Sequence, residues 1–278
     1  MKTTELGNAI RETVREWAQE EGLPAFDQSA HTGYLRHLVV REARNTGQAL
    51  VQLVTAPGDL QGADRLVDAL RTHPEVRSIH WAVNDSPAEV TNLPTNLLWG
   101  DDAIEEDLLG LRYRVRPNAF LQTNTAMAER LYELAIDYAG LTGEETVYDL
   151  YCGIGTIGLS MASRALTVWG IEVSEESVAC AIENAGLNGI SNAAFFAGEV
   201  GRSLQELSER AGLSGKVLRA LARLEAPRIV YVSCNPTTLA GNVKELVAEW
   251  GYTLVRVRPV DMFPHTPHVE SVALLHRV

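Results

Sequence analysis

The chain has 278 residues, of which 46% are hydrophobic and 22% are charged. That length can bury one large core or two modest ones, and we expect two domains. The net charge of −12 argues against a surface that coats nucleic acid in general, because neutralising phosphates requires clustered Lys and Arg. The sequence shows neither a bilayer-spanning apolar run, which takes ~20 residues, nor a signal-peptide pattern, so we expect a cytoplasmic protein.

The first 116 residues predict a small α+β domain. Its expected elements, in chain order, are a helix over 6–21, a hairpin of strands 35–40 and 48–54, a helix over 64–71, and strands 77–83 and 111–115. The acidic run Asp101 to Asp107 is expected to be a solvated loop or the start of a helix. Arg112, Arg114 and Arg116 alternate along the last strand and therefore point the same way, as Arg256 and Arg258 do near the C-terminus. Taken alone, each set indicates a solvated strand face.

A glycine-rich turn lies at the centre of the second half. Residues 146–151 form an apolar strand that leads into Gly153 and Gly155, after which the pattern becomes helical. Such glycines let a ligand lie close to the backbone, and a helix N-terminus offers free N–H groups. A second strand over 167–173 carries Glu172, at the spacing where an acid meets ribose hydroxyls. The pattern predicts a nucleotide-like cofactor. A helix over 127–138, closed by Gly140, precedes the turn, which is usual for methyltransferases.

The sheet that follows lacks one expected strand. The remaining predicted elements are helices over 174–188 and 238–250 and strands over 193–197, 228–232, 253–260 and 271–276. Between residues 200 and 224, where a doubly wound sheet needs a fourth apolar strand, only helical segments over 203–209 and 215–224 are expected. The pattern therefore predicts an α/β sheet with a gap.

Reactive groups follow the strands of this sheet. Cys234 comes directly after strand 228–232, and an accessible thiolate there can act as a nucleophile. Glu270 precedes the final strand, and antiparallel pairing could bring it beside Cys234 as a base. His265 and His268 have the spacing of metal ligands without a third partner, so phosphate contact or packing is favoured over a metal.

Three cysteines, far apart in the sequence, support neither disulfides nor a Cys-x-x-Cys metal site. Cys152 lies within the glycine turn, and we expect it to pack against the cofactor. Cys180 lies among apolar residues of a helix, and we expect it in the core.

These motifs together resemble the bacterial and archaeal RNA (uracil-5-)-methyltransferases. The resemblance covers nearly the whole chain and rests on five segments, which are Phe120-Leu121-Gln122-Thr123-Asn124, Asp149-Leu150-Tyr151-Cys152-Gly153-Ile154-Gly155, Gly170-Ile171-Glu172, Val232-Ser233-Cys234-Asn235-Pro236 and His268-Val269-Glu270. The strand from Leu35 to Glu42 is similar to the branch that modifies 23S ribosomal RNA more than to the tRNA branch.

The resemblance implies a fold, a cofactor and a mechanism. The fold is α/β: a Rossmann-like class I S-adenosylmethionine-dependent methyltransferase domain over 117–278, preceded by a smaller α+β, RNA-contacting domain over 1–116. Cys234 would add to C6 of a flipped-out uracil, and Glu270 would remove the C5 proton. The resemblance carries two further sets of residues over to this chain. The expected cofactor contacts are Gln122, Tyr151, Gly153, Gly155, Thr156 and Glu172, and the candidate RNA contacts are Arg210, Asn235, His265 and His268.

Two departures from the family accompany the resemblance. The ribosomal branch usually begins with a β-barrel and an iron–sulfur cysteine cluster, which do not precede Leu6. The family's Asp-Pro-Pro-Arg-x-Gly motif is reduced to Arg210-Ala211-Gly212-Leu213. We expect a sequence gapped before Arg210, or, if the deletion is genuine, weak cofactor binding and little activity.

Three other functions stay open. A nicotinamide-dependent oxidoreductase would explain the glycine turn and leaves Cys234 and Glu270 without a role. A non-catalytic RNA-binding module would explain the missing strand. Within the family, the alternative target is uridine 54 of tRNA.

Overall fold

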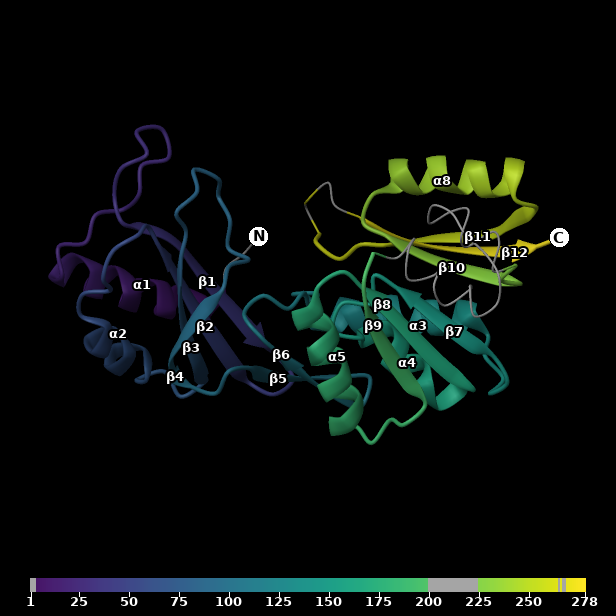
Figure 1. Ribbon diagram of the computed structural model, residues 1–278, viewed down its shortest axis with the longest axis horizontal. Helices are drawn as coiled ribbons and strands as arrows, with labels where there is room; N and C mark the ends of the chain where they lie inside the picture. The colour runs from purple at the N-terminus through teal and green to yellow at the C-terminus, as the bar shows by residue number, and fades with distance from the viewer. Residues whose placement is uncertain (1–3, 200–224, 265, 267–268) are drawn as a thin grey trace. The chain divides into compact units, whose positions relative to one another are not determined.

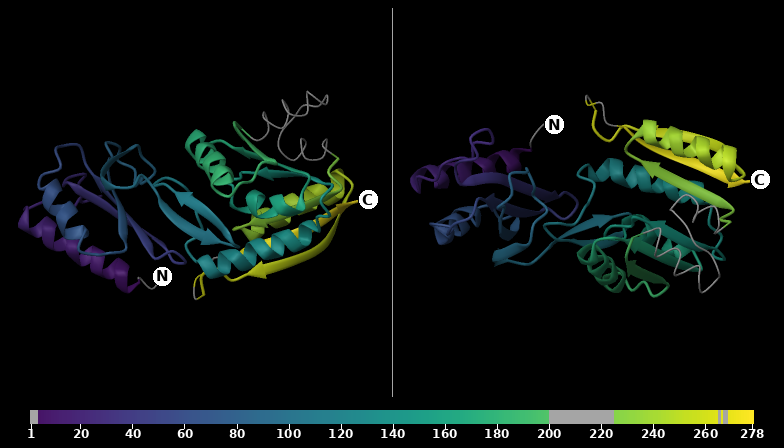
Figure 2. Two further views of the ribbon diagram at one scale, coloured as in Figure 1. Left: turned by 90° about the horizontal axis from the view of Figure 1, so that it is seen from below. Right: turned by 45° about the horizontal axis from the view of Figure 1, so that its top comes forward.

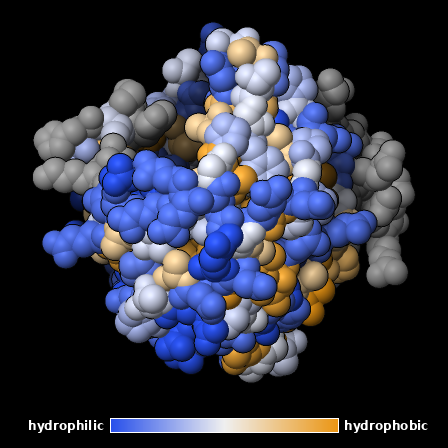
Figure 3. Space-filling model, turned by 90° about the vertical axis from the view of Figure 1, so that its left-hand side faces the viewer, coloured by the Kyte–Doolittle hydropathy of each residue, from blue (hydrophilic) through white to orange (hydrophobic). Residues whose placement is uncertain are grey.

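The computed structural model describes residues 4–199, 225–264, 266 and 269–278. Contacts between Cα atoms divide the chain into an N-terminal unit, residues 1–107 with 114–119, and a C-terminal unit, residues 108–113 with 120–278. Figure 1 labels the elements of both. Among the described helices, none combines the length and the apolar character needed to cross a membrane. The face drawn in Figure 3 is mainly hydrophilic, in keeping with the high charge of the chain.

The N-terminal unit is built on a four-stranded sheet in the order β1-β2-β3-β4. The strands are β1 (Leu35–Ala43), β2 (Gln48–Thr55), β3 (Val76–Val83) and β4 (Thr95–Gly100), and the helices are α1 (Glu5–Glu20) and α2 (Ala63–Leu70). β2 pairs antiparallel with β1 and parallel with β3, and β3 pairs antiparallel with β4. The predicted helices, hairpin and third strand are confirmed, whereas β4 was expected to be loop.

Both helices pack on one face of this sheet. The core joins Ile10, Val14 and Trp17 of α1 and two leucines of α2 to alternate residues of β2. Alternation follows from the strand period of two, because residues two apart share a face. Ala49, Val51 and Leu53 are the β2 members of this core, and all three are almost completely buried. The amphipathic spacing of α1 therefore predicted its buried side.

The acidic run forms a strand, contrary to the expected loop or helix start. β5 (Ile104–Leu108) and β6 (Leu111–Val115) make a two-stranded sheet. Glu106 is only 1% exposed, and its carboxylate accepts the backbone N–H groups of Arg44 at 2.7 Å and Asn45 at 2.9 Å. A buried carboxylate is tolerated where such donors replace water. The turn after β1 supplies them here.

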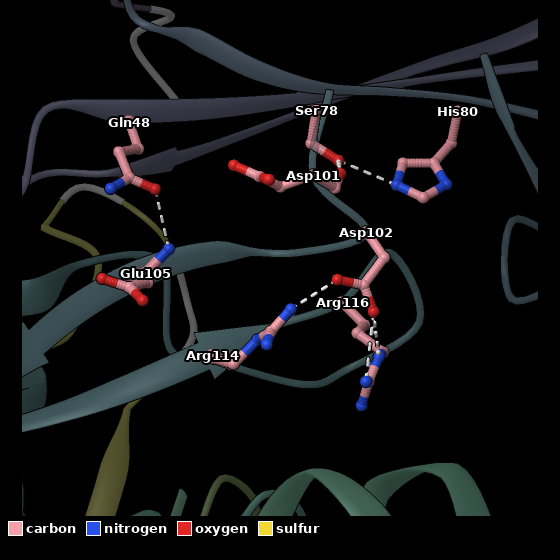
Figure 4. A network of polar contacts seen from close by, with 8 residues as sticks. All are labelled: Gln48, Ser78, His80, Asp101, Asp102, Glu105, Arg114 and Arg116. Atoms are coloured by element: carbon pink, nitrogen blue, oxygen red, sulfur yellow. Dashed lines mark hydrogen bonds and ion pairs between the residues drawn. The ribbon is translucent and has the colours of Figure 1, made fainter. Parts of the chain in front are cut away.

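Two of the alternating arginines form ion pairs on a strand face where their side chains stay partly exposed. Asp102 forms ion pairs with Arg114 and, at 3.1 Å, with Arg116 (Figure 4). Nearby, Ser78 Oγ lies 2.8 Å from the His80 ring and donates to the carbonyl of Asp101 at 2.5 Å. These contacts hold the strand connection after β4 against the sheet.

The C-terminal unit contains two sheets. A parallel sheet has the order β7-β8-β9 and an antiparallel sheet the order β10-β12-β11. The strands are β7 (Thr146–Leu150), β8 (Thr167–Glu172), β9 (Ala193–Ala197), β10 (Arg228–Ser233), β11 (Tyr252–Val260) and β12 (Glu270–Arg277). The helices are α3 (Thr125–Ala139), α4 (Thr156–Met161), the 3-10 turn η1 (Ala162–Arg164), α5 (Glu175–Leu187) and α8 (Pro236–Glu249). The strands and the helices α3, α5 and α8 were predicted within a few residues, α4 was predicted without bounds, and η1 was not predicted.

No strand among the described residues joins β7 to β10. The stretch over 200–224, where the missing fourth strand was expected, lies outside the described residues. The helical segments expected over 203–209 and 215–224 lie outside the described residues.

Two helices cover opposite faces of the antiparallel sheet. Ile229 and Tyr231 pack with α8, whereas Val230 and Val232 pack with α3. Figure 2 shows α8 running along one side of β10, β11 and β12. Because α3 also packs on Val147 of β7, it contacts both sheets of the unit. Gly140 closes α3 in the left-handed conformation, as predicted.

Candidate active site

The glycine turn after β7 adopts backbone angles that favour glycine. Gly153 has φ +54° and Gly155 has φ +83°, and Tyr151 also has a positive φ of +62°. A side chain other than glycine is strained there, a feature that clusters at functional sites. A Cβ added at Gly153 would meet no atom within 4 Å, so the turn leaves open space above its backbone. Tyr151 is 64% exposed beside that space.

Asp149 anchors the helix that follows this turn. Its carboxylate accepts the backbone N–H of Gly158 at 2.8 Å. A Cβ on Gly158 would lie 2.8 Å from the same oxygen, so this close approach needs glycine. Burial raises the pKa of Asp149 to about 6, with the charge of Glu172 adding to the rise and the Gly158 N–H opposing it. A half-buried acid thus holds the first turn of α4.

Glu172 ends β8 beside the same turn. One carboxylate oxygen accepts the N–H of Gly153 at 3.1 Å, and the other accepts those of Val173 at 2.8 Å and Ser174 at 3.1 Å. Ser174 caps α5 by accepting the N–H of Ser177, as predicted. Glu172 therefore links the end of one strand to the turn that follows its neighbour.

Tyr132 of α3 contacts the helix that follows this turn. Thr156, the first residue of α4, donates its hydroxyl to the Tyr132 oxygen at 3.4 Å. Burial raises the pKa of Tyr132, and the charges of Asp149 and Glu270 add to the rise. The Tyr132 hydroxyl therefore contacts the first residue of the helix that follows the glycine turn. The sequence identified Tyr132 only as part of a helix.

Cys234 is exposed at the end of β10. Ser233 Oγ accepts the N–H of Asn235 at 3.2 Å and donates to its carbonyl at 3.1 Å. The Asn235 side chain caps α8 by accepting the N–H groups of Thr237 at 3.0 Å and Thr238 at 3.1 Å. The thiol therefore lies between the strand end and the capped helix start.

Glu270 lies opposite this turn. β10 and β12 pair antiparallel, and Ser233 faces Ser271. Cys234 follows Ser233 at the end of β10, and Glu270 precedes Ser271 at the start of β12. Glu270 is 9% exposed. Burial raises its pKa, and hydrogen bonding by the Gln122 side chain partly offsets the rise. The register thus brings together the two residues whose chemistry the sequence singled out.

The other cysteines differ from Cys234. Cys180 is completely buried in α5, which confirms the predicted core position. Cys152 is 7% exposed, and burial raises the pKa of its thiol, with Asp149 and Glu172 adding to the rise. Both effects disfavour a thiolate there.

Three candidate residues, Arg210, His265 and His268, lie outside the described residues. Within the described part of the chain, no group of three or more His, Cys, Asp or Glu residues could hold a metal ion. Sequence reasoning missed one hydrogen bond, in which the Asn124 side chain donates to the carbonyl of Met262 at 2.9 Å. The sequence signal that could have indicated this bond was the position of Asn124 in the same motif as Gln122.

Comparisons with known proteins give the fold and the family of this chain. The fold is that of a Rossmann-like methyltransferase, as predicted: a tRNA m1G37 methyltransferase from M. jannaschii superposes with a TM-score of 0.50 at 10% identity, over the whole of this chain and 81% of that one. The family model of the tRNA (uracil-5-)-methyltransferases matches residues 99–209 and 205–278. The chain therefore belongs to the tRNA (uracil-5-)-methyltransferase family, which confirms the resemblance.

Individual relatives extend this match. An RNA methyltransferase of Clostridium tetani (strain Massachusetts / E88), described as uncharacterized, is 41% identical over 97% of this chain and 62% of its own length. The tRNA (uracil-54, C5)-methyltransferase of Pyrococcus abyssi, in complex with S-adenosyl-L-homocysteine, is 32% identical with a TM-score of 0.80, over 98% of this chain and 67% of that one. The chain thus spans about three fifths of the length of curated relatives that it matches.

Proposed function

We propose that this protein transfers a methyl group from S-adenosylmethionine to C5 of a uridine in RNA, through a covalent bond between Cys234 and C6 of the base. The observation that carries the proposal is the β10–β12 register. It puts the exposed thiol of Cys234 and the buried carboxyl of Glu270 next to the Ser233–Ser271 pair, at one end of the sheet. A nicotinamide oxidoreductase gives neither residue a role. The family supports the methyl transfer reaction.

The glycine turn fits the cofactor. Open space lies above Gly153, the strained and exposed Tyr151 stands beside it, and Glu172 ends the neighbouring strand. The Pyrococcus abyssi relative is a complex with S-adenosyl-L-homocysteine. We assign cofactor contacts to the residues that the family resemblance indicates, namely Gln122, Tyr151, Gly153, Gly155, Thr156 and Glu172. When bound, the cofactor supplies an electrophilic methyl group.

The reaction needs a nucleophile because uracil C5 alone is too weak to take a methyl group. The Cys234 thiolate would add to C6, which pushes electron density to C5 and the C4 carbonyl oxygen. After C5 has bonded to the methyl carbon, Glu270 would remove the C5 proton as a carboxylate. Re-formation of the C5–C6 double bond then expels the Cys234 thiolate, so the thiol is regenerated.

Two observations bear on the target RNA, and they favour different RNAs. The strand Leu35 to Glu42 favours 23S ribosomal RNA, as the sequence resemblance indicates. The structural relative from Pyrococcus abyssi favours uridine 54 of tRNA as the second candidate. In either case residues 1–116 would contact RNA and 117–278 would carry the reaction, with Arg210, Asn235, His265 and His268 as further RNA contacts. The proposal includes a cytoplasmic location, where both RNAs occur.

The test supplies the protein with S-adenosylmethionine labelled in its methyl group and with either a 23S rRNA fragment or a tRNA transcript. Nucleoside mass spectrometry should find labelled 5-methyluridine in one of them. Binding of both RNAs without labelled product would support the non-catalytic module instead. The mass of the expressed protein, compared with 30.4 kDa, decides whether the motif expected before Arg210 is present.

A further inference from the structure

The edge strand β1 of the N-terminal unit has two faces of different character. Leu38 and Val40 pack against the core that α1 and α2 cover. Because side chains alternate along a strand, His37 and Arg41 lie on the opposite face. β1 is the outermost strand of its sheet, and all of its residues except the last are half-buried. The side chains of this second face therefore keep contact with solvent.

Arg41 has no partner for its charge in the described part of the chain. Its side chain makes neither a hydrogen bond nor an ion pair with a described residue, and its Nε atom is buried without an acceptor. Burial lowers the pKa of this guanidinium, and no neighbouring charge contributes to the shift. A charge that leaves water is ordinarily paired, because its desolvation costs free energy. The protein without RNA thus holds a partly desolvated cation whose cost no described residue offsets.

The acidic side chains near this strand are engaged elsewhere. Glu42, the next residue, lies on the helix side, where its carboxylate accepts the hydroxyl of Thr4 at the start of α1. Glu106 accepts two backbone N–H groups of the turn after β1. Directly across from Arg41 on β2 lies Leu50, whose side chain is apolar. The positive charge is therefore available to an anionic ligand.

His37 adds a second polar group to the same face. Its Nε2 atom is buried and has no hydrogen-bond partner among the described residues. Four residues of a strand span about 13 Å, so His37 and Arg41 are too far apart to contact one small anion. Val39 between them and Val54 across from His37 are apolar. The face therefore suits an extended ligand that carries negative groups along its length.

We infer that this face of β1 binds the sugar–phosphate backbone of the substrate RNA, with Arg41 paired to one phosphate and His37 donating to another. The inference rests on the proposed function, because it takes RNA as the ligand, and it names the surface through which residues 1–116 would contact it. A guanidinium offers a fork of donors that matches phosphate oxygens. Because Arg41 has already lost part of its water, pairing with phosphate requires less further desolvation.

The first experiment measures stability and needs no RNA. Arg41→Met keeps a long unbranched side chain and removes the charge. The guanidinium makes no stabilising contact, so this variant should melt at the temperature of wild type or above it. Arg15→Ala is the matched control, because it removes one charge from an exposed ion pair with Glu12 on α1 and should leave the melting temperature unchanged. A lower melting temperature for Arg41→Met would show that Arg41 stabilises the fold, and would overturn the inference.

The second experiment measures equilibrium binding of the 23S rRNA fragment and of the tRNA transcript. All proteins carry Cys234→Ala, which forms no covalent bond, so the result does not depend on the reaction. Adding Arg41→Met should weaken binding about tenfold and reduce the slope of log K against log salt by about 0.7–0.9, the loss of one phosphate contact. Arg41→Lys should keep the slope because it keeps the charge, and Arg15→Ala should change neither quantity.

His37→Phe separates the uncharged donor from the charge. The substitution keeps an aromatic ring and removes the N–H group. At about pH 8, where an ordinary imidazole is neutral, binding should weaken about three- to tenfold with no change in the salt slope.

The inference is wrong if Arg41→Met binds RNA with unchanged affinity and slope, or if the Cys234→Ala protein binds neither RNA. The assay for labelled 5-methyluridine decides the proposed function separately. Weakened binding by Arg41→Met together with no labelled product from wild type would keep this surface and remove the catalytic proposal.

Discussion

Ser233 of β10 faces Ser271 of β12 in an antiparallel pair, and this one pair determines where Cys234 and Glu270 lie. A register shift of one residue would turn the alternating side chains of a strand to the other face. Val230 and Val232 would then leave α3 and face α8, so the packing of two helices stabilises the register. The chemistry of the proposed site therefore depends on the core of the sheet.

Glu270→Gln separates the two halves of the proposed reaction. The amide keeps the size of the side chain but accepts no proton, so Cys234 addition and methylation should proceed while elimination stops. We expect a methylated protein–RNA adduct to accumulate and turnover to fall by a factor of about 10²–10⁴. Denaturing electrophoresis detects the adduct. Normal turnover by this variant would remove Glu270 from the mechanism.

Glu172→Gln tests the cofactor site. The substitution removes the charge and one acceptor from a group that holds three backbone N–H donors at the glycine turn. We expect the dissociation constant for S-adenosylmethionine to rise about tenfold, since bonds to a charged group are worth ~1.5–3 kcal/mol. Calorimetry measures this directly, with Glu176→Gln in the next helix as the matched control. Equal affinity in wild type and Glu172→Gln would place the ribose elsewhere.

Asp149→Asn should change how stability depends on pH. The folded-state pKa of Asp149 is about 6, against an ordinary 3.8. Between pH 3.8 and about pH 6, Asp149 therefore binds a proton in the folded protein and not in the unfolded chain. Stability from this group is therefore greatest below pH ~4 and falls as the pH rises to ~6, by up to ~3 kcal/mol. Asparagine can still accept the Gly158 N–H and does not ionise. The stability of the variant relative to wild type should rise over that range, as unfolding at several pH values would show. A constant difference would mean that Asp149 does not titrate there.

Asn235→Ala removes the cap of α8 next to Cys234. The two N–H groups that the side chain accepts would lose their partner, at about 1 kcal/mol of stability. Asn235→Ser keeps a capping oxygen and should restore that stability, as a melting curve would show. If serine also restores turnover, Asn235 acts through the cap. If turnover stays low in a stable serine variant, the Asn235 amide contacts RNA.

Local pattern predicted most of the C-terminal unit. The glycine turn, its flanking strands and the Ser174 cap depend on neighbours in sequence, so single-sequence reasoning reached them. The pairing that brings Glu270 near Cys234 could also be predicted, because both residues flank apolar strands. The hydrogen bond from Asn124 to the Met262 carbonyl could not be predicted, since it joins distant segments that meet only in the folded chain.

The N-terminal unit shows where charge patterns mislead. The run from Asp101 to Asp107 is as acidic as a solvated loop, yet Ile104, Glu106 and Leu108 alternate toward the interior. The backbone donors that make Glu106 tolerable come from Arg44 and Asn45, far away in sequence. Burial of a charge is decided by such tertiary partners, which composition does not reveal.

The covalent step is the central claim, and one measurement tests it directly. The protein is incubated with S-adenosylmethionine and with 5-fluorouridine-containing 23S rRNA or tRNA, then run on a denaturing gel. Fluorine at C5 cannot leave as a proton does, so the reaction should stall as an adduct in wild type and give no adduct in Cys234→Ala. An adduct that persists in Cys234→Ala, or labelled 5-methyluridine made by that variant from ordinary RNA, would contradict the account.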